Sequence, residues 1–86
     1  MNVWEIAILK CIESYSGKVM LQQIYERLSS FIKLTEDDLR ETEWGGRPAY
    51  QHQVRSHIVN LCQAGELNRI SRGCYSLTDK GRKRIN

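Results

Sequence analysis

Hydrophobic residues recur at helical spacing in three long stretches of the chain. The first stretch covers residues 1–14, and a Ser-Tyr-Ser-Gly turn at residues 14–17 ends it. The second covers residues 21–32 and carries one continuous apolar stripe, with polar side chains on its other side. The third covers residues 49–64, where Gly65 follows as a C-terminal cap. The pattern therefore predicts three helices.

Shorter elements lie between and after these helices. Thr35 is a typical N-cap and predicts a short helix over residues 36–41, which the Trp-Gly-Gly-Arg-Pro sequence that follows breaks. Residues 66–78 alternate in polarity around a Ser-Arg-Gly turn and predict a β-hairpin. Ile70 is out of phase with the first hairpin strand, which indicates a bulge or a twist near the turn. Residues 18–20 form either a brief strand or an extended entry to the second helix.

A final short helix, over residues 79–86, completes a recognisable order of elements. The order is helix, helix, short helix, helix, hairpin and basic C-terminal helix or tail. A chain of 86 residues has room for one domain only. We therefore predict a single winged-helix domain over residues 1–86, of the winged helix-turn-helix type. It is mainly α with a small β-hairpin (α+β), with residues 49–64 as recognition helix and residues 66–78 as wing.

Charge is distributed unequally along the chain. Residues 1–46 carry five basic and eight acidic groups, whereas residues 47–86 carry eight basic groups and only Glu66 and Asp79 as acids. The net charge is −3 in the first part and +6 in the second, which gives +3 for the whole chain. This asymmetry indicates that the second part meets a polyanion.

The predicted recognition helix has a polar outer face without carboxylates. Such a face suits the major groove of DNA, where Gln and Asn match adenine and Arg matches guanine. Arginines at the wing reach phosphates or the minor groove, and the basic C-terminal residues add attraction that is independent of sequence. The expected DNA-binding residues are Arg47, His52, Gln53, Arg55, Ser56, Asn60, Arg69, Arg72, Lys80, Arg82, Lys83 and Arg84.

The sequence argues against several other kinds of site. His52 and His57 are five residues apart, about 140° around a helix, so they cannot hold one metal ion together. The three cysteines lack the spacing of a zinc site or a paired disulfide framework. We therefore expect no catalytic residues, metal, cofactor or small-molecule substrate. The longest aliphatic run near the start is residues 6–9, too short for a membrane span or a signal peptide, so we expect a cytoplasmic protein.

Several sequence segments resemble a known family. The Ala-Gly-Glu-Leu segment at residues 64–67 and the Gly-Cys-Tyr-Ser-Leu-Thr-Asp-Lys-Gly segment at residues 73–81 resemble the N-terminal domain of Mrr-type restriction endonucleases. Residues 24–26 and 34–39 fit the same pattern. The resemblance implies a DNA-recognition module, which in that family is usually followed by a separate nuclease domain. The 86 residues contain no nuclease domain, so we expect a non-enzymatic module.

Several roles remain open from the sequence. The domain is expected to be either a DNA-recognition module of a restriction system or a small regulator of transcription from a phage or mobile element. The alternative is a protein-interaction winged helix, such as a phage-encoded inhibitor of a host defence complex, which uses the acidic segment of residues 36–43. A homodimer that pairs through Trp4 and the first helix is a further hypothesis.

Overall fold

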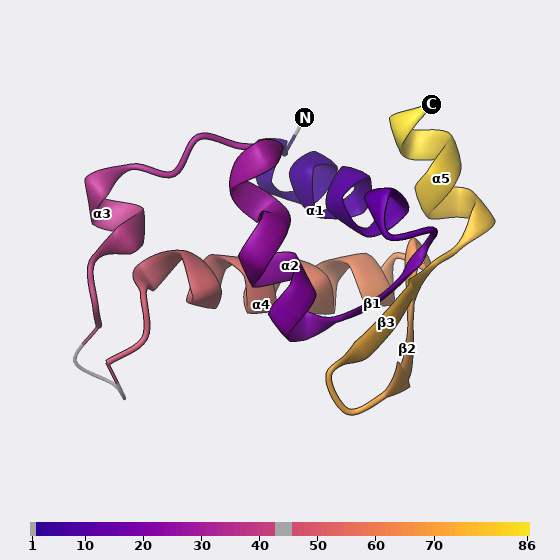
Figure 1. Ribbon diagram of the computed structural model, residues 1–86. Helices are drawn as coiled ribbons and strands as arrows, with labels where there is room; N and C mark the ends of the chain where they lie inside the picture. The colour runs from indigo at the N-terminus through magenta and orange to yellow at the C-terminus, as the bar shows by residue number, and fades with distance from the viewer. Residues whose placement is uncertain (1, 43–45) are drawn as a thin grey trace.

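A computed structural model describes residues 2–42 and 46–86 of the chain (Figure 1). Residue 1, where the predicted first helix begins, lies outside the described residues. So do residues 43–45, which belong to the predicted breaker and to the acidic segment. The elements, in chain order, are α1 (Val3–Ser14), β1 (Lys18–Met20), α2 (Leu21–Arg27), the 3₁₀ turn η1 (Leu28–Ser30), α3 (Glu36–Leu39), α4 (Ala49–Gln63), β2 (Leu67–Ser71), β3 (Cys74–Leu77) and α5 (Asp79–Ile85).

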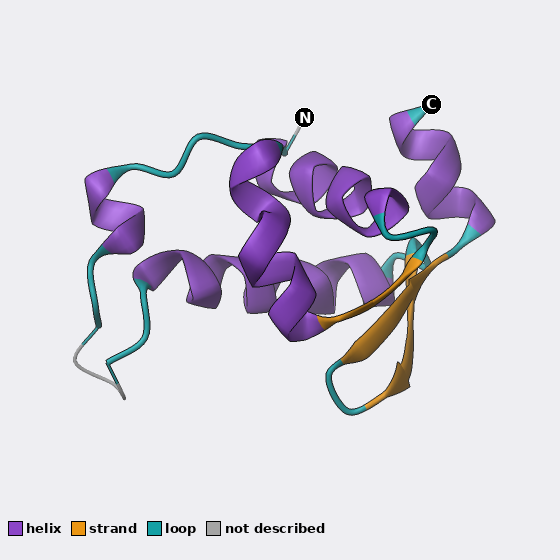
Figure 2. Cartoon of the chain, in the orientation of Figure 1, coloured by secondary structure: helices purple, strands orange, loops and turns teal. Residues whose placement is uncertain are grey.

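The fold is α+β and has the order of a winged helix. Helices form most of the described chain, and a small sheet lies at one end of them (Figure 2). The sheet is antiparallel with strand order β1-β3-β2, so residues 18–20 form a strand rather than an extended entry. The predicted wing is the hairpin β2–β3, which projects beyond the helices (Figure 1).

The hairpin contains the irregularity that the sequence indicates. Leu67 pairs with Leu77 and Arg69 pairs with Tyr75, but Ser71 pairs with Cys74, so the register shifts between Arg69 and Ser71. Ile70 is the extra residue in this bulge, and it is about half exposed. The bulge lets Leu67 remain in the core while the wing tip turns away from it.

The core lies between α1, α2, α4 and the base of the sheet. Its fully buried side chains are Ile8, Leu9, Cys11, Ile12, Val19, Ile24, Leu28, Val54, Leu61 and Leu67. They come from α1, β1, α2, the 3₁₀ turn, α4 and β2, so every long element of the sequence pattern contributes to one hydrophobic cluster. Full burial of each such side chain stabilises the fold by about 1.5–3 kcal/mol before entropic costs.

The second predicted helix ends earlier than residue 32. The α-helix ends at Arg27 and continues as a 3₁₀ turn, in which the Phe31 amide donates to the Leu28 carbonyl over 2.9 Å. Ser29 and Ser30 explain the change, because serine has low helix propensity. Phe31 consequently leaves the apolar stripe and is 36% exposed.

The short predicted helix is also shorter in the structure. It ends at Leu39 rather than residue 41, because Arg40 adopts an extended backbone with ψ of 134°. The chain then pairs with the segment that precedes α4. The Ala49 amide donates to the Arg40 carbonyl over 2.8 Å, and Glu41 and Pro48 form an isolated β-bridge. This pairing fixes the chain on both sides of the 43–45 segment and leads Arg47 directly into α4.

Candidate nucleic-acid interface

A groove of about 520 Å³ opens between the N-terminal part of α2, α4 and the wing hairpin. Four segments of the chain supply arginines to it: the loop before α4, α4 itself, β2 and the wing turn. The remaining wall consists of amide, aromatic and aliphatic side chains and one glycine. The lining residues are Leu21, Gln22, Tyr25, Arg47, Gln51, Arg55, Arg69, Arg72, Gly73 and Tyr75.

Local geometry explains why these side chains converge. Gln51 and Arg55 are one helical turn apart, so they project from the same side of α4. That side adjoins the buried positions Val54 and Ile58, which hold α4 against the core. On the hairpin, Arg69 and Tyr75 are directly paired, so their side chains lie on the same face of the sheet.

The groove is strongly cationic. Arg47, Arg55, Arg69 and Arg72 are all exposed, and none of the groove's lining residues carries a carboxylate. Burial raises the pKa of Tyr25, while the positive charges of Arg55 and Arg47 act in the opposite direction. Both arginines line the same groove as the Tyr25 ring.

The other predicted residues of α4 lie away from the groove. At about 100° per residue, His52 lies about 60° around the helix from Arg55 and Ser56 about 100°. Asn60 and Gln53 lie about 140° and 160° away, toward the far side of the helix. His52 also has a neighbour, because its Nε2 is 3.4 Å from Thr42 Oγ1. The structure thus groups four of the predicted arginines but not the four polar residues of α4.

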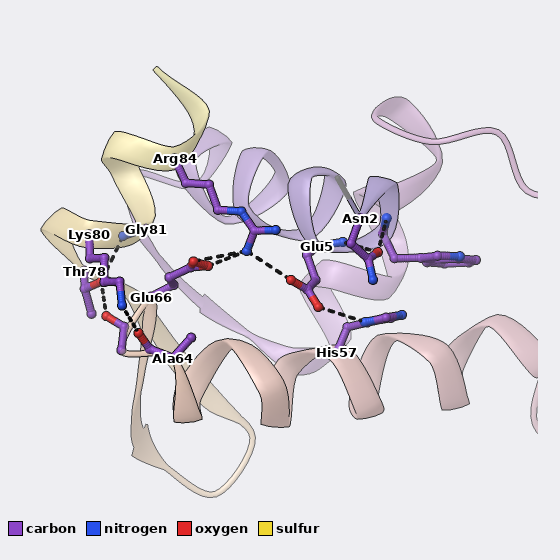
Figure 3. A network of polar contacts seen from close by, with 11 residues as sticks. Asn2, Glu5, His57, Ala64, Glu66, Thr78, Lys80, Gly81 and Arg84 are labelled. Atoms are coloured by element: carbon purple, nitrogen blue, oxygen red, sulfur yellow. Dashed lines mark hydrogen bonds and ion pairs between the residues drawn. The ribbon is translucent and has the colours of Figure 1, made fainter.

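The predicted basic tail is largely engaged within the fold. Arg84 Nη1 donates to Glu66 and to Glu5, with 3.0 Å to Glu5 Oε1 (Figure 3). Lys80 Nζ donates to the Ala64 carbonyl over 2.6 Å, and Arg82 Nε lies 3.8 Å from Glu13 Oε2. Lys83 is exposed. Three of these four side chains thus hold α5 on the rest of the domain.

The carboxylate of Glu5 extends this ionic network to α4. Glu5 Oε2 lies 3.2 Å from His57 Nδ1 (Figure 3). The imidazole of His57 stacks on Trp4 with ring centroids 6.5 Å apart. The side chains of Glu5 and His57 are only about 15% exposed. Trp4 thus packs against α4 of the same molecule.

The two sequence segments that carry the family resemblance meet in space. Gly65 has φ of 77° and ends α4 with a Schellman motif, in which the Glu66 amide donates to the Leu61 carbonyl over 2.9 Å. The Thr78 hydroxyl then donates to the Gly65 carbonyl over 2.6 Å (Figure 3). At Gly81, a Cβ atom would collide with the Glu66 carbonyl. These contacts therefore join the end of α4 to the start of α5.

Six of the ten residues that line the groove were not among the predicted DNA-binding residues, and three of the six are polar residues of α2 and α4. Gln51 could have been found, because it precedes Arg55 by one helical turn. Helical periodicity places Tyr25 on the apolar stripe of residues 21–32 and Gln22 on the polar side. Their position follows from how α2 and the hairpin pack beside α4, which helical periodicity alone does not contain.

Within residues 2–42 and 46–86, no group of three or more His, Cys, Asp or Glu side chains is placed to hold a metal ion. None of the helices in the described part of the chain is long and apolar enough to cross a bilayer.

Together, the fold and the groove define a winged-helix domain with a cationic groove beside its wing. The chain matches the family described as the Mrr N-terminal domain over residues 4–86, and it belongs to that family. Neither a curated protein nor a solved structure matches it significantly.

Proposed function

We propose that this domain binds double-stranded DNA and has no catalytic function of its own. The single observation that carries the proposal is the convergence of four exposed arginines, from four segments of the chain, on one groove without carboxylates. Guanidinium groups are suited to phosphate because they are always charged and donate in a planar fork. Membership of the Mrr N-terminal domain family supports a role in recognition of DNA by a restriction-related system.

The arrangement suggests how a duplex lies on the domain. Arg72 in the wing turn and Arg47 before α4 are at separate points of the groove wall, so they can contact the backbone at separate phosphates. Gln51 projects from α4 between them and presents a donor and an acceptor that match base edges in the major groove. Val59, one turn after Arg55 and more than half exposed, offers an apolar surface to a thymine methyl group.

The protein-interaction alternative has less support among the described residues. It relies on the acidic segment, but Asp37 pairs with Arg40 at 3.0 Å and Asp38 forms a capping box with Thr35. These two carboxylates therefore stabilise α3 and its connection. A partner would have to compete with these local contacts.

The test is a titration of a fluorescent 20-base-pair duplex of mixed sequence, followed by anisotropy over a series of salt concentrations. If each of the four groove arginines displaces one condensed counterion from the duplex, the slope of log K against log salt is about −3.6. Arg72→Ala should weaken the slope by about 0.9 and reduce affinity on all sequences alike.

Lys10→Ala is the matched control, because it removes one exposed positive charge from α1, outside the groove. It should leave the slope nearly unchanged. Affinity that is flat across the salt series, or equal losses in Arg72→Ala and Lys10→Ala, would contradict the proposal. If charge reversal of residues 36–41 abolished the biological activity of the protein while Arg72→Ala left that activity unchanged, the result would favour a protein partner.

A further inference from the structure

The hydroxyl of Tyr25 stands out among the groove's polar groups. Its oxygen is buried, and it has no hydrogen-bond partner among the described residues. The ring is held in place by an edge-to-face contact with Tyr50, with centroids 6.0 Å apart and planes at 89°. Tyr50 is itself buried at the start of α4, so the phenol is fixed in the groove wall rather than free to turn to solvent.

The two arginines that line the groove with Tyr25 offer its hydroxyl no acceptor. A phenol needs an acceptor for its hydrogen, whereas an arginine side chain has donors only. Arg55 and Arg47 are the cations whose charge acts on Tyr25. A buried hydroxyl without an acceptor among the described residues is costly, so an acceptor that enters the groove would satisfy it. What it lacks is an acceptor, and the neighbouring positive charges favour one that is negatively charged.

We propose that Tyr25, Arg47 and Arg55 form a subsite for one backbone phosphate, in which Tyr25 Oη donates to a non-bridging oxygen and the two guanidinium groups neutralise the charge. This inference rests on the proposed function and assigns it a specific contact. Arg47 and Arg55 are exposed at the groove, so their side chains can move aside to admit the phosphate. A groove of about 520 Å³ has room for a phosphodiester with its sugar, but not for a whole duplex.

The phosphate subsite predicts different effects of Tyr25→Phe on duplex affinity and on stability. Removal of the hydroxyl should weaken duplex binding about tenfold or more, because a hydrogen bond to a charged acceptor is lost. It should not lower the free energy of unfolding, because the hydroxyl has no partner in the free domain. The salt slope should also stay unchanged, because no cation is removed.

Tyr15→Phe is the matched control with the reverse expectation. The Tyr15 hydroxyl donates to the Gln23 carbonyl over 3.2 Å, and Tyr15 is not part of the groove. Tyr15→Phe should lower the free energy of unfolding and leave duplex affinity unchanged. Equal duplex affinity of Tyr25→Phe and the wild-type chain would overturn the inference while the proposed function stands.

A double-mutant cycle locates the phosphate. Tyr25→Phe and Arg55→Ala should be non-additive in duplex affinity, because both contact the same group, whereas Tyr25→Phe and Arg72→Ala should add. Additivity in both cycles would overturn the shared subsite. If the wild-type chain binds no duplex, the proposed function is wrong. Titration with inorganic phosphate, followed by NMR, then tests whether the subsite binds an anion. Shifts at Tyr25 that Tyr25→Phe weakens would support an anion site for another phosphorylated ligand, and their absence would overturn it.

Discussion

Arg84 and Glu66 form a close ion pair that joins the last helix to the turn after α4. Arg84 Nη1 contacts both carboxylate oxygens of Glu66, at 3.1 Å for Oε2, and the hydrogen bond keeps the pKa of Arg84 above its usual value. The same nitrogen donates to Glu5 on α1. The side chain of Glu66 is 8% exposed and that of Arg84 is 27% exposed, so water screens this network only in part. Helices α1 and α5, near the two ends of the described chain, are thereby joined to the turn after α4.

The first prediction concerns Arg84→Ala. Loss of the guanidinium leaves Glu66 and Glu5 as neighbouring, mostly buried carboxylates, so we expect a loss of about 2–3 kcal/mol in the free energy of unfolding. Lys83→Ala removes an adjacent exposed charge and should change stability by less than about 0.5 kcal/mol. Urea denaturation of both variants measures the difference. A stable Arg84→Ala variant with weakened DNA binding would instead assign Arg84 to the interface.

The second prediction concerns Gly81→Ala. Alanine usually stabilises a helix by about 1 kcal/mol relative to glycine. At this position, however, the added Cβ would overlap the Glu66 carbonyl and approach Leu77 Cδ1 to 2.9 Å. We expect the opposite sign, a destabilisation of about 1–3 kcal/mol, because α5 must move away from the turn. Thermal unfolding measures this change in stability, with Lys83→Ala as the control for alanine in α5. A higher melting temperature for Gly81→Ala would refute the close contact.

The sequence contained the order and type of nearly all elements, because apolar periodicity and capping residues are local. It also contained the arginines of the groove, since Arg55 follows from the face of α4 and Arg72 from the wing turn. It did not contain the role of the C-terminal basic residues. A positive charge in a sequence looks the same whether it faces DNA or a buried carboxylate, and the contact of Arg84 with Glu5 spans 79 residues.

The third prediction is a dependence of stability on pH through Cys11. Burial raises the pKa of this thiol from 9.0 to about 11. Below pH 9 the thiol is protonated in both the folded and the unfolded chain, so it contributes no pH dependence. Between pH 9 and pH 11 the unfolded chain loses this proton while the folded chain retains it, so stability falls as pH rises. A shift of this size corresponds to a loss of about 2–3 kcal/mol by pH 11.

Comparison with Cys11→Ala isolates this effect from other groups that ionise at high pH. The variant should be less stable at pH 8, because it leaves a small cavity, but its stability should fall less steeply above pH 9. Cys62→Ala is the matched control, because burial also raises the pKa of Cys62 but its side chain is partly exposed. Parallel stability curves for the wild-type chain and Cys11→Ala between pH 8 and pH 11 would show that the thiol ionises freely in the folded state.

The fourth prediction distinguishes Gln51 from Gln53, both on α4, as the residue that contacts DNA bases. The polar face alone favoured Gln53 as a reader of bases, but Gln53 lies about 160° around the helix from Arg55. Gln51 lies only about 40° from Arg55 and lines the groove with it. If the groove side of α4 enters the major groove, Gln51→Ala should relax the preferred sequence by about 1–3 kcal/mol at one base pair.

Selection from a randomised duplex library, followed by sequencing, tests this with Gln53→Ala as the matched control. Both variants lose the same side chain from the same helix, and Gln53 is exposed, so neither should unfold the domain. Because Gln53 projects away from the cationic groove, the library enriched by Gln53→Ala should equal that of the wild-type chain. The reverse result would mean that the duplex lies on the opposite side of α4. In that orientation the four arginines would be turned away from the phosphates, so the same experiment also tests the groove as the DNA-binding surface.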